Sequence, residues 1–191
     1  FWLINELRAA LKREGREYSF DELHSLAEEA KSLNAYIDNE YPTFNTPGGD
    51  IRVKMAEYLQ QTGQAVPQTV GEWVRCIFES LALKVKYCAD YLKNTLGMPL
   101  EDAFVINGGS RNTLLVQLLS DALRLPIHAG MPYATLAGNL LTQFYADGKV
   151  SSVEEMREVA GRSFQMKEYE PQPGRDWDAA LQAAVEKNVC H

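Results

Sequence analysis

Cysteine and histidine are scarce in this chain of 191 residues, with three of each. The cysteines, Cys76, Cys88 and Cys190, form no C-x-x-C pair, and the histidines show no metal-ligand spacing. Cys76 and Cys88 stand a little over three turns apart in one expected helix, so they cannot bond to each other within it. We therefore expect reduced thiols, no disulfide and no metal site.

An excess of basic residues and long apolar runs are also missing. The formal net charge is −7, and the acidic residues are spread along the chain. This charge offers no electrostatic surface for nucleic acid. No apolar run approaches the roughly 18 residues that a membrane-spanning helix needs. The expected protein is therefore cytoplasmic, with no nucleic-acid or membrane partner.

The chain is rich in helix-start signals. Ser19 with Glu22 and Thr69 with Glu72 have the spacing of capping boxes, and apolar residues at helical spacing follow both. The expected elements are helices at 1–14, 19–30, 50–63, 69–96, 134–145, 152–162 and 176–187, with strands at 103–106, 125–129 and 164–169. The β–α–β–α order in the middle favours an α/β fold with a small sheet covered by helices.

The most informative segment is the turn at residues 107–110 (Asn-Gly-Gly-Ser). It follows an apolar run that is typical of a buried strand, and a helical pattern begins directly after it. Glycines leave bare backbone for a ligand to approach, and a helix start presents unpaired N–H groups. The alternative is a tight turn with Ser110 as the N-cap. The turn is not a P-loop, because no Lys-Ser/Thr follows.

Other polar or small residues are interpreted as structural. The small side of the helix at Ala134, Ala137 and Gly138 is expected to let two helices pack closely. Residues 38–40 (Asp-Asn-Glu) are expected in a polar surface loop, and His128 has no visible partner.

The remaining sulfur and indole groups are expected in the core. They are Cys76, Cys88, Trp2 and Trp73. No Ser-His-Asp set and no catalytic acid pair can be assembled from this sequence.

Four segments together resemble the C-terminal lobe of FGGY-type carbohydrate kinases: residues 1–6 (FWLINE), 72–83 (EWVRCIFESLAL), 106–115 (INGGSRNTLL) and 134–139 (ATLAGN). Two further segments, residues 44–50 and 60–67, are most similar to the rhamnulokinase branch of that family. The resemblance follows nearly the whole chain in order.

This resemblance implies an α/β fold of the actin-like ATPase (ribonuclease H-like) type. Residues 1–191 would be the C-terminal nucleotide-binding lobe of a longer kinase, with the N-terminal part of the lobe missing. The implied reaction transfers a phosphoryl group from ATP with Mg²⁺ to the 1-hydroxyl of L-rhamnulose, in rhamnose catabolism. L-fuculose or D-xylulose stays open as the acceptor, because the sugar pocket lies outside this chain.

The resemblance also implies the ATP contacts. Gly108 is the best single contact, Asn107 and Gly109 flank it, and Asn5 stands where the family usually has Gln on the first helix. Asn107 replaces the first glycine of the family's usual triple. Its side chain is expected to leave the nucleotide less room to approach the backbone. Tyr133 replaces the usual Glu, so no polar role is carried over to it.

The family's catalytic Asp, phosphate loop and sugar-binding residues precede the matched region. No catalytic residue and no metal ligand is therefore expected in this chain, which should be inactive alone. Leu59 occupies the position of a cysteine that pairs with the counterpart of Cys76 in some relatives, so this disulfide is excluded. The competing hypothesis is a non-enzymatic helical interaction module.

Overall fold

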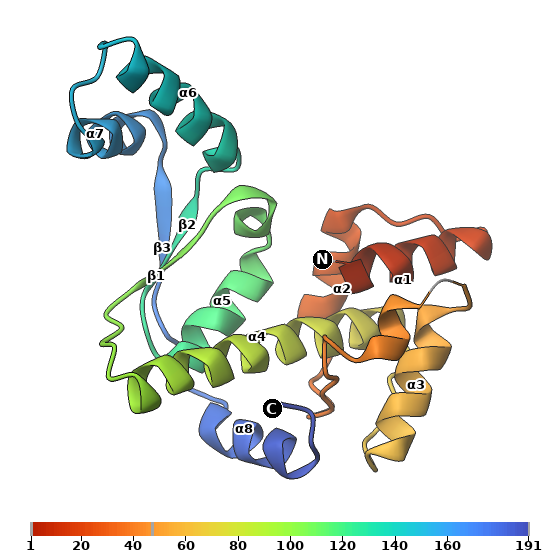
Figure 1. Ribbon diagram of the computed structural model, residues 1–191. Coiled ribbons are helices and arrows are strands. Elements are labelled where there is room, and N and C mark those ends of the chain that lie inside the picture. Colours follow the sequence, from red (N-terminus) through yellow and green to blue (C-terminus); the bar gives the residue numbers. More distant parts are fainter. Residues whose placement is uncertain (1, 47, 191) are drawn as a thin grey trace. The chain divides into compact units, whose positions relative to one another are not determined.

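The chain folds into two compact units. The computed structural model describes residues 2–46 and 48–190. Unit 1 comprises Phe1–Pro99 and Gly174–His191, and unit 2 comprises Leu100–Pro173 (Figure 1). Unit 2 is thus inserted in the sequence of unit 1, and the chain passes between them at two points.

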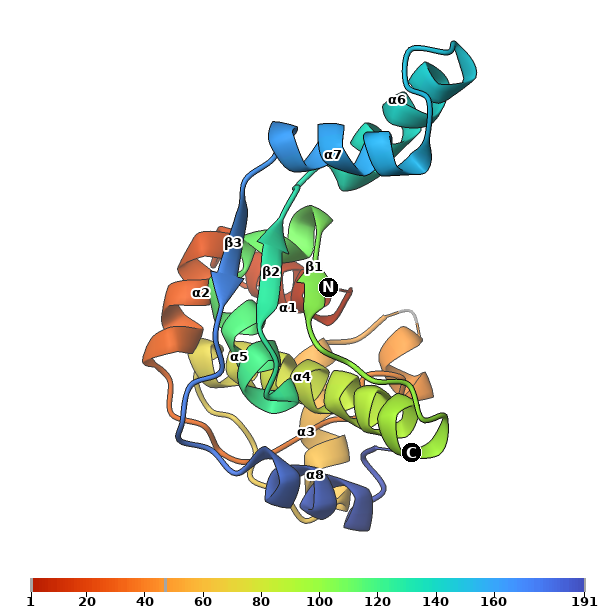
Figure 2. The ribbon, with the colours of Figure 1, turned by 90° about the vertical axis from the view of Figure 1, so that its left-hand side faces the viewer.

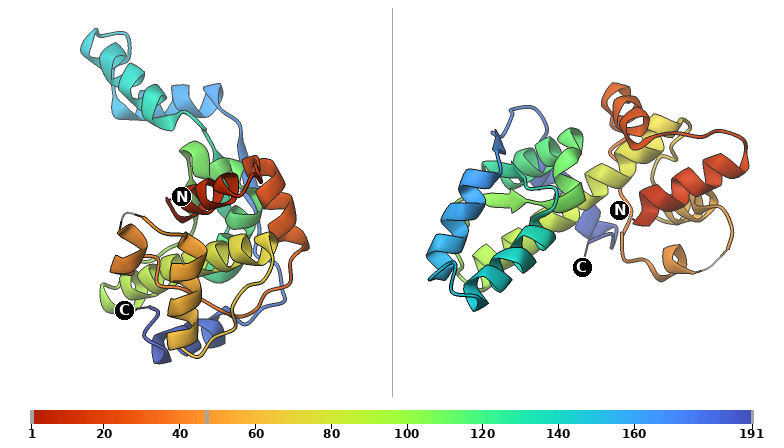
Figure 3. Two further views of the ribbon diagram at one scale, coloured as in Figure 1. Left: turned by 90° about the vertical axis from the view of Figure 1, so that its right-hand side faces the viewer. Right: turned by 90° about the horizontal axis from the view of Figure 1, so that it is seen from above.

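Unit 1 is built from helices. Its elements are α1 (Trp2–Arg13), α2 (Phe20–Glu29), the 3-10 turn η1 (Pro42–Asn45), α3 (Ile51–Gln61), α4 (Val70–Thr95) and α8 (Trp177–Glu186). The 26-residue α4 carries buried side chains along one face, among them Trp73, Ile77 and Phe78. Helices α1 and α2 pack against it (Figure 3, left).

The predicted capping boxes at the starts of α2 and α4 are confirmed. The Glu22 amide donates to Ser19 Oγ over 3.1 Å, and the Glu22 carboxylate accepts from the Ser19 amide over 2.7 Å. Thr69 and Glu72 make the same two bonds at 3.2 and 3.0 Å. Each pair satisfies backbone N–H groups that a helix start leaves unpaired. These starts were predictable because every group involved lies within four residues.

Gly71, near the start of α4, allows α2 to lie close to this helix. A Cβ atom at Gly71 would lie 2.2 Å from the carbonyl oxygen of Leu26 and 3.3 Å from the Cβ of Ala30. Backbone atoms of α2 cannot yield to such a contact without moving the helix. Glycine is therefore required here by packing.

Gly71→Ala should lower the free energy of unfolding by about 3 kcal/mol, because it forces α2 and α4 apart. Gly138→Ala in α6 is the matched control, since a Cβ atom there meets no described atom within 4 Å. It should be neutral or stabilise by up to about 1 kcal/mol. Urea unfolding followed by circular dichroism measures both effects. Equal effects of the two substitutions would contradict this explanation.

Unit 2 contains the three-stranded sheet. Its elements are β1 (Ala103–Val105), the 3-10 turn η2 (Asn107–Arg111), α5 (Thr113–Leu123), β2 (Ile127–Gly130), α6 (Ala134–Ala146), α7 (Val153–Ser163) and β3 (Met166–Tyr169). The strand order is β1-β2-β3, with β1 parallel to β2 and β3 antiparallel to it. β1 and β3 are therefore the edge strands of this sheet.

Helix α5 covers one face of this sheet. Ile127, Ala129 and Tyr169 point to that face and are buried. Figure 2 shows the opposite face without a helix of unit 2 over it. Phe104 lies on this open face and is 64% exposed, so the prediction of a buried strand at 103–106 is wrong. The reason is that β1 is an edge strand with only one face covered.

Helices α6 and α7 lie side by side (Figure 3, right). An apolar groove of about 460 Å³ runs along them, lined by larger side chains such as Leu140, Phe144 and Val159. Ala137 also lines this groove, but Gly138 is exposed and adjoins open space. The prediction of close helix packing through Gly138 is therefore wrong. No described helix is long and apolar enough to cross a membrane.

Candidate functional site

The glycine turn after β1 is a 3-10 turn and not the start of α5. Asn107 adopts a left-handed backbone conformation with φ of 59°, which asparagine tolerates better than most residues. The Ser110 hydroxyl donates to the Asn107 carbonyl over 2.7 Å. Asn112 caps α5, because its Oδ1 accepts from the Leu115 amide over 3.0 Å. The prediction of Ser110 as N-cap is wrong, since η2 delays the helix start by two residues.

The backbone at Gly108 is open. The residue is exposed, and a Cβ atom built on it would meet no described atom within 4 Å. Its φ lies outside the left-handed range that favours glycine. Neither packing nor conformation within the described chain therefore requires glycine here.

Side chains fix the turn against the loop that precedes α6. Asn107 Nδ2 donates to Thr135 Oγ1 over 3.2 Å, and Asn107 Oδ1 accepts from the Thr135 amide over 3.3 Å. The Arg111 guanidinium donates to the Tyr133 hydroxyl over 3.2 Å and lies 5.7 Å from that ring. The Asn107 side chain is thus engaged with Thr135. Neither pair was predictable from local sequence, because the partners lie 28 and 22 residues apart.

Asn112 directly follows the 3-10 turn and belongs to the same polar motif. It is 1% exposed, and its Nδ2 has no hydrogen-bond partner in the described part of the chain. Its capping role accounts for the oxygen but leaves the amide nitrogen unexplained. A sequence reading could have found the cap, because Asn112 stands three residues before Leu115, the spacing that an N-cap bond needs.

Asn5 belongs to unit 1, whereas the three turn residues belong to unit 2. The Asn5 side chain is exposed on α1 and lines a hollow of about 280 Å³ with Arg8, Ala9, Lys12, Glu17 and Tyr18. The structure thus brings Asn107, Gly108 and Gly109 together as one turn. Asn5 is placed in a separate hollow of its own unit.

Two cations flank Asn5 in this hollow. The Arg8 guanidinium lies 4.2 Å from the centre of the Phe20 ring, and its Nε donates to the Tyr18 carbonyl over 2.9 Å. Lys12 pairs with Glu17 over 2.7 Å, and this hydrogen bond lowers the pKa of the Glu17 carboxyl. The hollow therefore presents the Asn5 amide beside two cations and one carboxylate, and that carboxylate is paired with Lys12.

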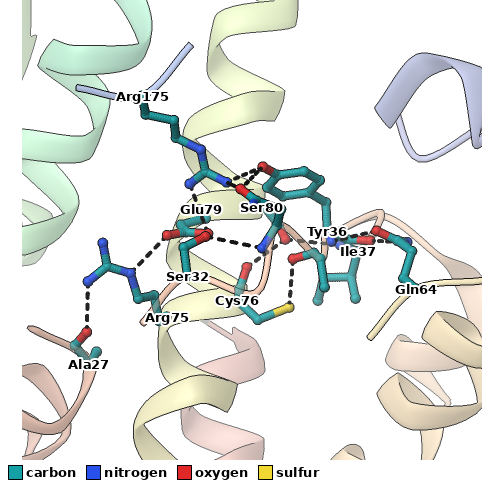
Figure 4. Close-up of polar contacts among 12 residues, drawn as sticks. Ala27, Ser32, Tyr36, Ile37, Gln64, Arg75, Cys76, Glu79, Ser80 and Arg175 are labelled. Atoms are coloured by element: carbon teal, nitrogen blue, oxygen red, sulfur yellow. Dashed lines mark hydrogen bonds and ion pairs between the residues drawn. The ribbon is translucent and has the colours of Figure 1, made fainter. Parts of the chain in front are cut away.

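A buried ionic cluster holds the returning C-terminal segment in unit 1 (Figure 4). Glu79 is 1% exposed and accepts from Arg75 Nε at 2.8 Å, Arg175 Nη1 at 2.9 Å and Ser32 Oγ at 2.7 Å. Arg175 also lies over the Tyr36 ring and donates to its hydroxyl. Burial raises the pKa of Tyr36 to about 12. All polar groups of Glu79 are satisfied, so the cluster stabilises the fold and shows no sign of a reactive group.

Several core and loop predictions need correction. Asp38 is only 6% exposed and accepts from the Glu40 amide over 2.9 Å, so residues 38–40 do not form a plain surface loop. Trp2 is 54% exposed and Cys88 is also exposed. Both lie on helices that are buried on other faces. An apolar side chain in a helical pattern does not by itself show which face it occupies.

The other core predictions are confirmed. Trp73 and Cys76 are buried, and burial raises the pKa of the Cys76 thiol to about 12.

His128 does have a neighbour, because its Nε2 lies 3.5 Å from a carboxylate oxygen of Asp102. The cysteines are free, and Leu59 is buried at the position that excludes the family disulfide. Within residues 2–46 and 48–190, no group of three His, Cys, Asp or Glu side chains could hold a metal ion.

Solved structures of a xylulose kinase and a glycerol kinase share this fold. Xylulose kinase from Rhodospirillum rubrum matches with a TM-score of 0.67 at 17% identity, over 96% of this chain and 36% of that one. Plasmodium falciparum glycerol kinase with ADP matches with a TM-score of 0.63 at 13% identity, over 97% of this chain and 35% of that one. The predicted actin-like ATPase fold is confirmed.

Sequence relatives identify the family. Rhamnulokinase of Bacteroides thetaiotaomicron is 36% identical over 94% of this chain and 36% of its own length. Rhamnulokinase of Enterococcus faecalis is 33% identical over 90% of this chain and 34% of its own length. The chain thus spans about a third of the length of these relatives. Residues 1–146 match the C-terminal domain of the FGGY family of carbohydrate kinases, and the chain belongs to this family.

Proposed function

We propose that the intact protein is an ATP-dependent kinase that phosphorylates L-rhamnulose at its 1-hydroxyl. Membership of a carbohydrate kinase family supports the reaction type. The sugar is proposed from the relatives named rhamnulokinase at 33–36% identity. L-fuculose and D-xylulose are the competing acceptors, and a cytoplasmic location goes with this metabolic role.

The open turn at Gly108 is the observation that carries the nucleotide assignment. The space that a Cβ atom of residue 108 would occupy is empty, and the described fold does not require glycine there. Such a position fits a ligand that rests on bare backbone. Asn107 and Gly109 complete this contact. In unit 1, Asn5 offers an amide beside Arg8, whose positive charge suits an anionic nucleotide, while Lys12 in the same hollow is paired with Glu17. ATP supplies the transferable phosphoryl group when bound, and these residues bind and orient it.

The described residues do not supply the rest of the chemistry. Among the described residues no group of three His, Cys, Asp or Glu side chains could hold a metal ion, and Mg²⁺ would be held largely by the phosphates of ATP, by water and by residues of the intact protein. Phosphoryl transfer depends on positioning and charge stabilisation. The 191-residue chain is therefore expected to have negligible turnover.

Addition of ATP or ADP to the isotope-labelled chain should shift the amide resonances of Gly108, Gly109 and Asn5. These backbone groups border the proposed nucleotide contacts, so ¹H–¹⁵N correlation spectra measure the effect directly. Binding should be weak, because the remaining contacts of an actin-like cleft are absent from the chain. Shifts confined to other residues would favour the interaction-module hypothesis.

A turnover assay of the intact protein completes this test. ATP consumption with L-rhamnulose, in preference to L-fuculose and D-xylulose, is the expected result. Consumption with another of these ketoses would change the sugar and leave the reaction. No ATP turnover with any ketose or polyol would refute the kinase proposal.

A further inference from the structure

Helices α6 and α7 contribute little to the core of unit 2. Of the 13 residues of α6 only Leu141 is buried, and none of the described residues of α7 is buried. Helix α5 of the same unit is shorter, yet six of its 11 residues are buried. A helix in a protein owes most of its stability to the packing of an apolar face. The packing that α6 and α7 need is therefore incomplete within the described chain.

Helix α6 has one apolar face and one face of small or polar residues. Leu136, Leu140 and Phe144 recur every four residues along the apolar face, whereas Asn139 and Thr142 lie on the opposite face. No residue of α6 is charged. This pattern is typical of a helix that is buried along one face. However, Leu136 is 68% exposed and Leu140 is 50% exposed, so the apolar face lacks its cover.

The apolar face of α6 forms one wall of the groove between α6 and α7. Val159 of α7 and Phe164, directly after this helix, form part of the other wall, and every lining side chain is uncharged. Both hydroxyl groups in the lining are already engaged. Tyr133 accepts a hydrogen bond from Arg111, and Ser163 donates to the Val159 carbonyl over 2.7 Å. Small-molecule sites need a few well-placed polar groups, so the groove suits an apolar protein segment better.

The length of the relatives indicates where such a segment comes from. This chain covers 36% and 34% of the two rhamnulokinases, so about two thirds of each relative has no counterpart in it. A segment of the same polypeptide meets the groove at an effective concentration on the order of millimolar, whereas a second copy must bind from dilute solution.

We propose that an apolar segment of the intact protein, from outside residues 1–191, fills the groove and covers Leu136 and Leu140. The segment lies against α6 in the manner of a helix or strand in a hydrophobic groove. It thereby also holds the start of α6, where Thr135 is bonded to Asn107 of the glycine turn. The inference concerns packing and is independent of the reaction and of the sugar.

Thiol labelling of the intact protein tests whether the groove is filled. Leu136→Cys places a thiol on the groove wall, and Asn139→Cys is the matched control on the opposite face of the same helix. Under native conditions the thiol at position 136 should react with a maleimide about tenfold more slowly than the thiol at position 139, because the segment must first open. Peptide mass spectrometry measures each rate. Equal rates would show an open groove and overturn the proposal.

Photo-crosslinking identifies what fills the groove. Benzoylphenylalanine in place of Leu140 in the intact protein should link, within one polypeptide, to a residue outside 1–191. A link between two polypeptides would assign the groove to a second copy, and a link only to residues within 1–191 would show that the chain covers its own helix. Either of these results overturns the proposal.

Leu136→Glu adds a measurement of stability. The melting temperature of the intact protein should fall by about 5 °C, because the carboxylate must lose water or displace the segment. Asn139→Glu is the control on the polar face and should leave the melting temperature nearly unchanged. Equal melting temperatures of the two variants would contradict a filled groove. None of these outcomes bears on the kinase proposal, which the turnover assay decides.

Discussion

Glu79→Ala is expected to lower the free energy of unfolding of unit 1 by about 3 kcal/mol. The substitution leaves Arg75 and Arg175 without their shared carboxylate, although their side chains are only 21% and 19% exposed. An uncompensated charge at a partly buried position is costly, because the guanidinium loses water without gaining an acid. Urea unfolding followed by tryptophan fluorescence measures the effect, since all three tryptophans belong to unit 1.

Two further variants test this explanation. Glu79→Gln keeps the shape and removes the charge, so it should lose most of the same stability. Glu17→Ala removes the acid of an exposed pair, in which Lys12 and Glu17 are 67% and 70% exposed, and it should barely move the unfolding midpoint. If Glu79→Ala were as mild as Glu17→Ala, the two guanidinium groups would have to turn freely to solvent.

The cluster also explains how the chain closes unit 1 after unit 2. Arg175 comes directly after Gly174, where the sequence re-enters unit 1. Its guanidinium reaches Glu79 on α4 and lies 4.6 Å from the Trp177 ring at the start of α8. One buried carboxylate thus fixes the returning segment to the longest helix. The sequence could not predict this bond, because its partners are 96 residues apart.

Local chemistry was predictable from the sequence. The helix starts at Ser19 and Thr69 depend on partners three residues away, and both capping boxes form. The strands follow from short apolar runs between turns, and their order in the chain gives the α/β class. The family resemblance predicted the actin-like fold, which local patterns alone could not specify.

Predictions that needed a distant partner failed. Asp38 is buried in a loop whose Ile37 amide donates to Ser80 Oγ on α4, and a polar tripeptide does not indicate such burial. Trp2 and Cys88 lie on exposed sides of helices that are buried elsewhere. At the candidate site, the glycine turn was predicted, but the hydrogen bonds of its side chains to Thr135 and Tyr133 were not. The cap moved from Ser110 to Asn112 because a 3-10 turn intervenes.

Gly108→Val in the intact enzyme is expected to raise the KM for ATP by about tenfold or more. The branched side chain would occupy the space in which the nucleotide is proposed to touch the backbone. The KM for sugar should change little, because the turn is proposed to contact only the nucleotide. Steady-state kinetics with each substrate varied in turn measures this difference.

The stability of the same variant decides what the glycine is for. A Cβ atom at Gly108 meets no described atom within 4 Å, and residues other than glycine can adopt its backbone φ. The melting temperature of the variant should therefore stay the same. Gly138→Val is the matched control in unit 2, since its Cβ position is equally open and it should change neither KM. At Gly71 and Gly130 a Cβ atom would strike backbone oxygens at 2.2 and 2.7 Å, so glycine there serves the fold. A lower melting temperature, together with an equal rise in the KM for ATP and the KM for sugar, would place Gly108 among the glycines that the fold requires. An unchanged fold with a defect specific to ATP would mean that its missing side chain serves the ligand.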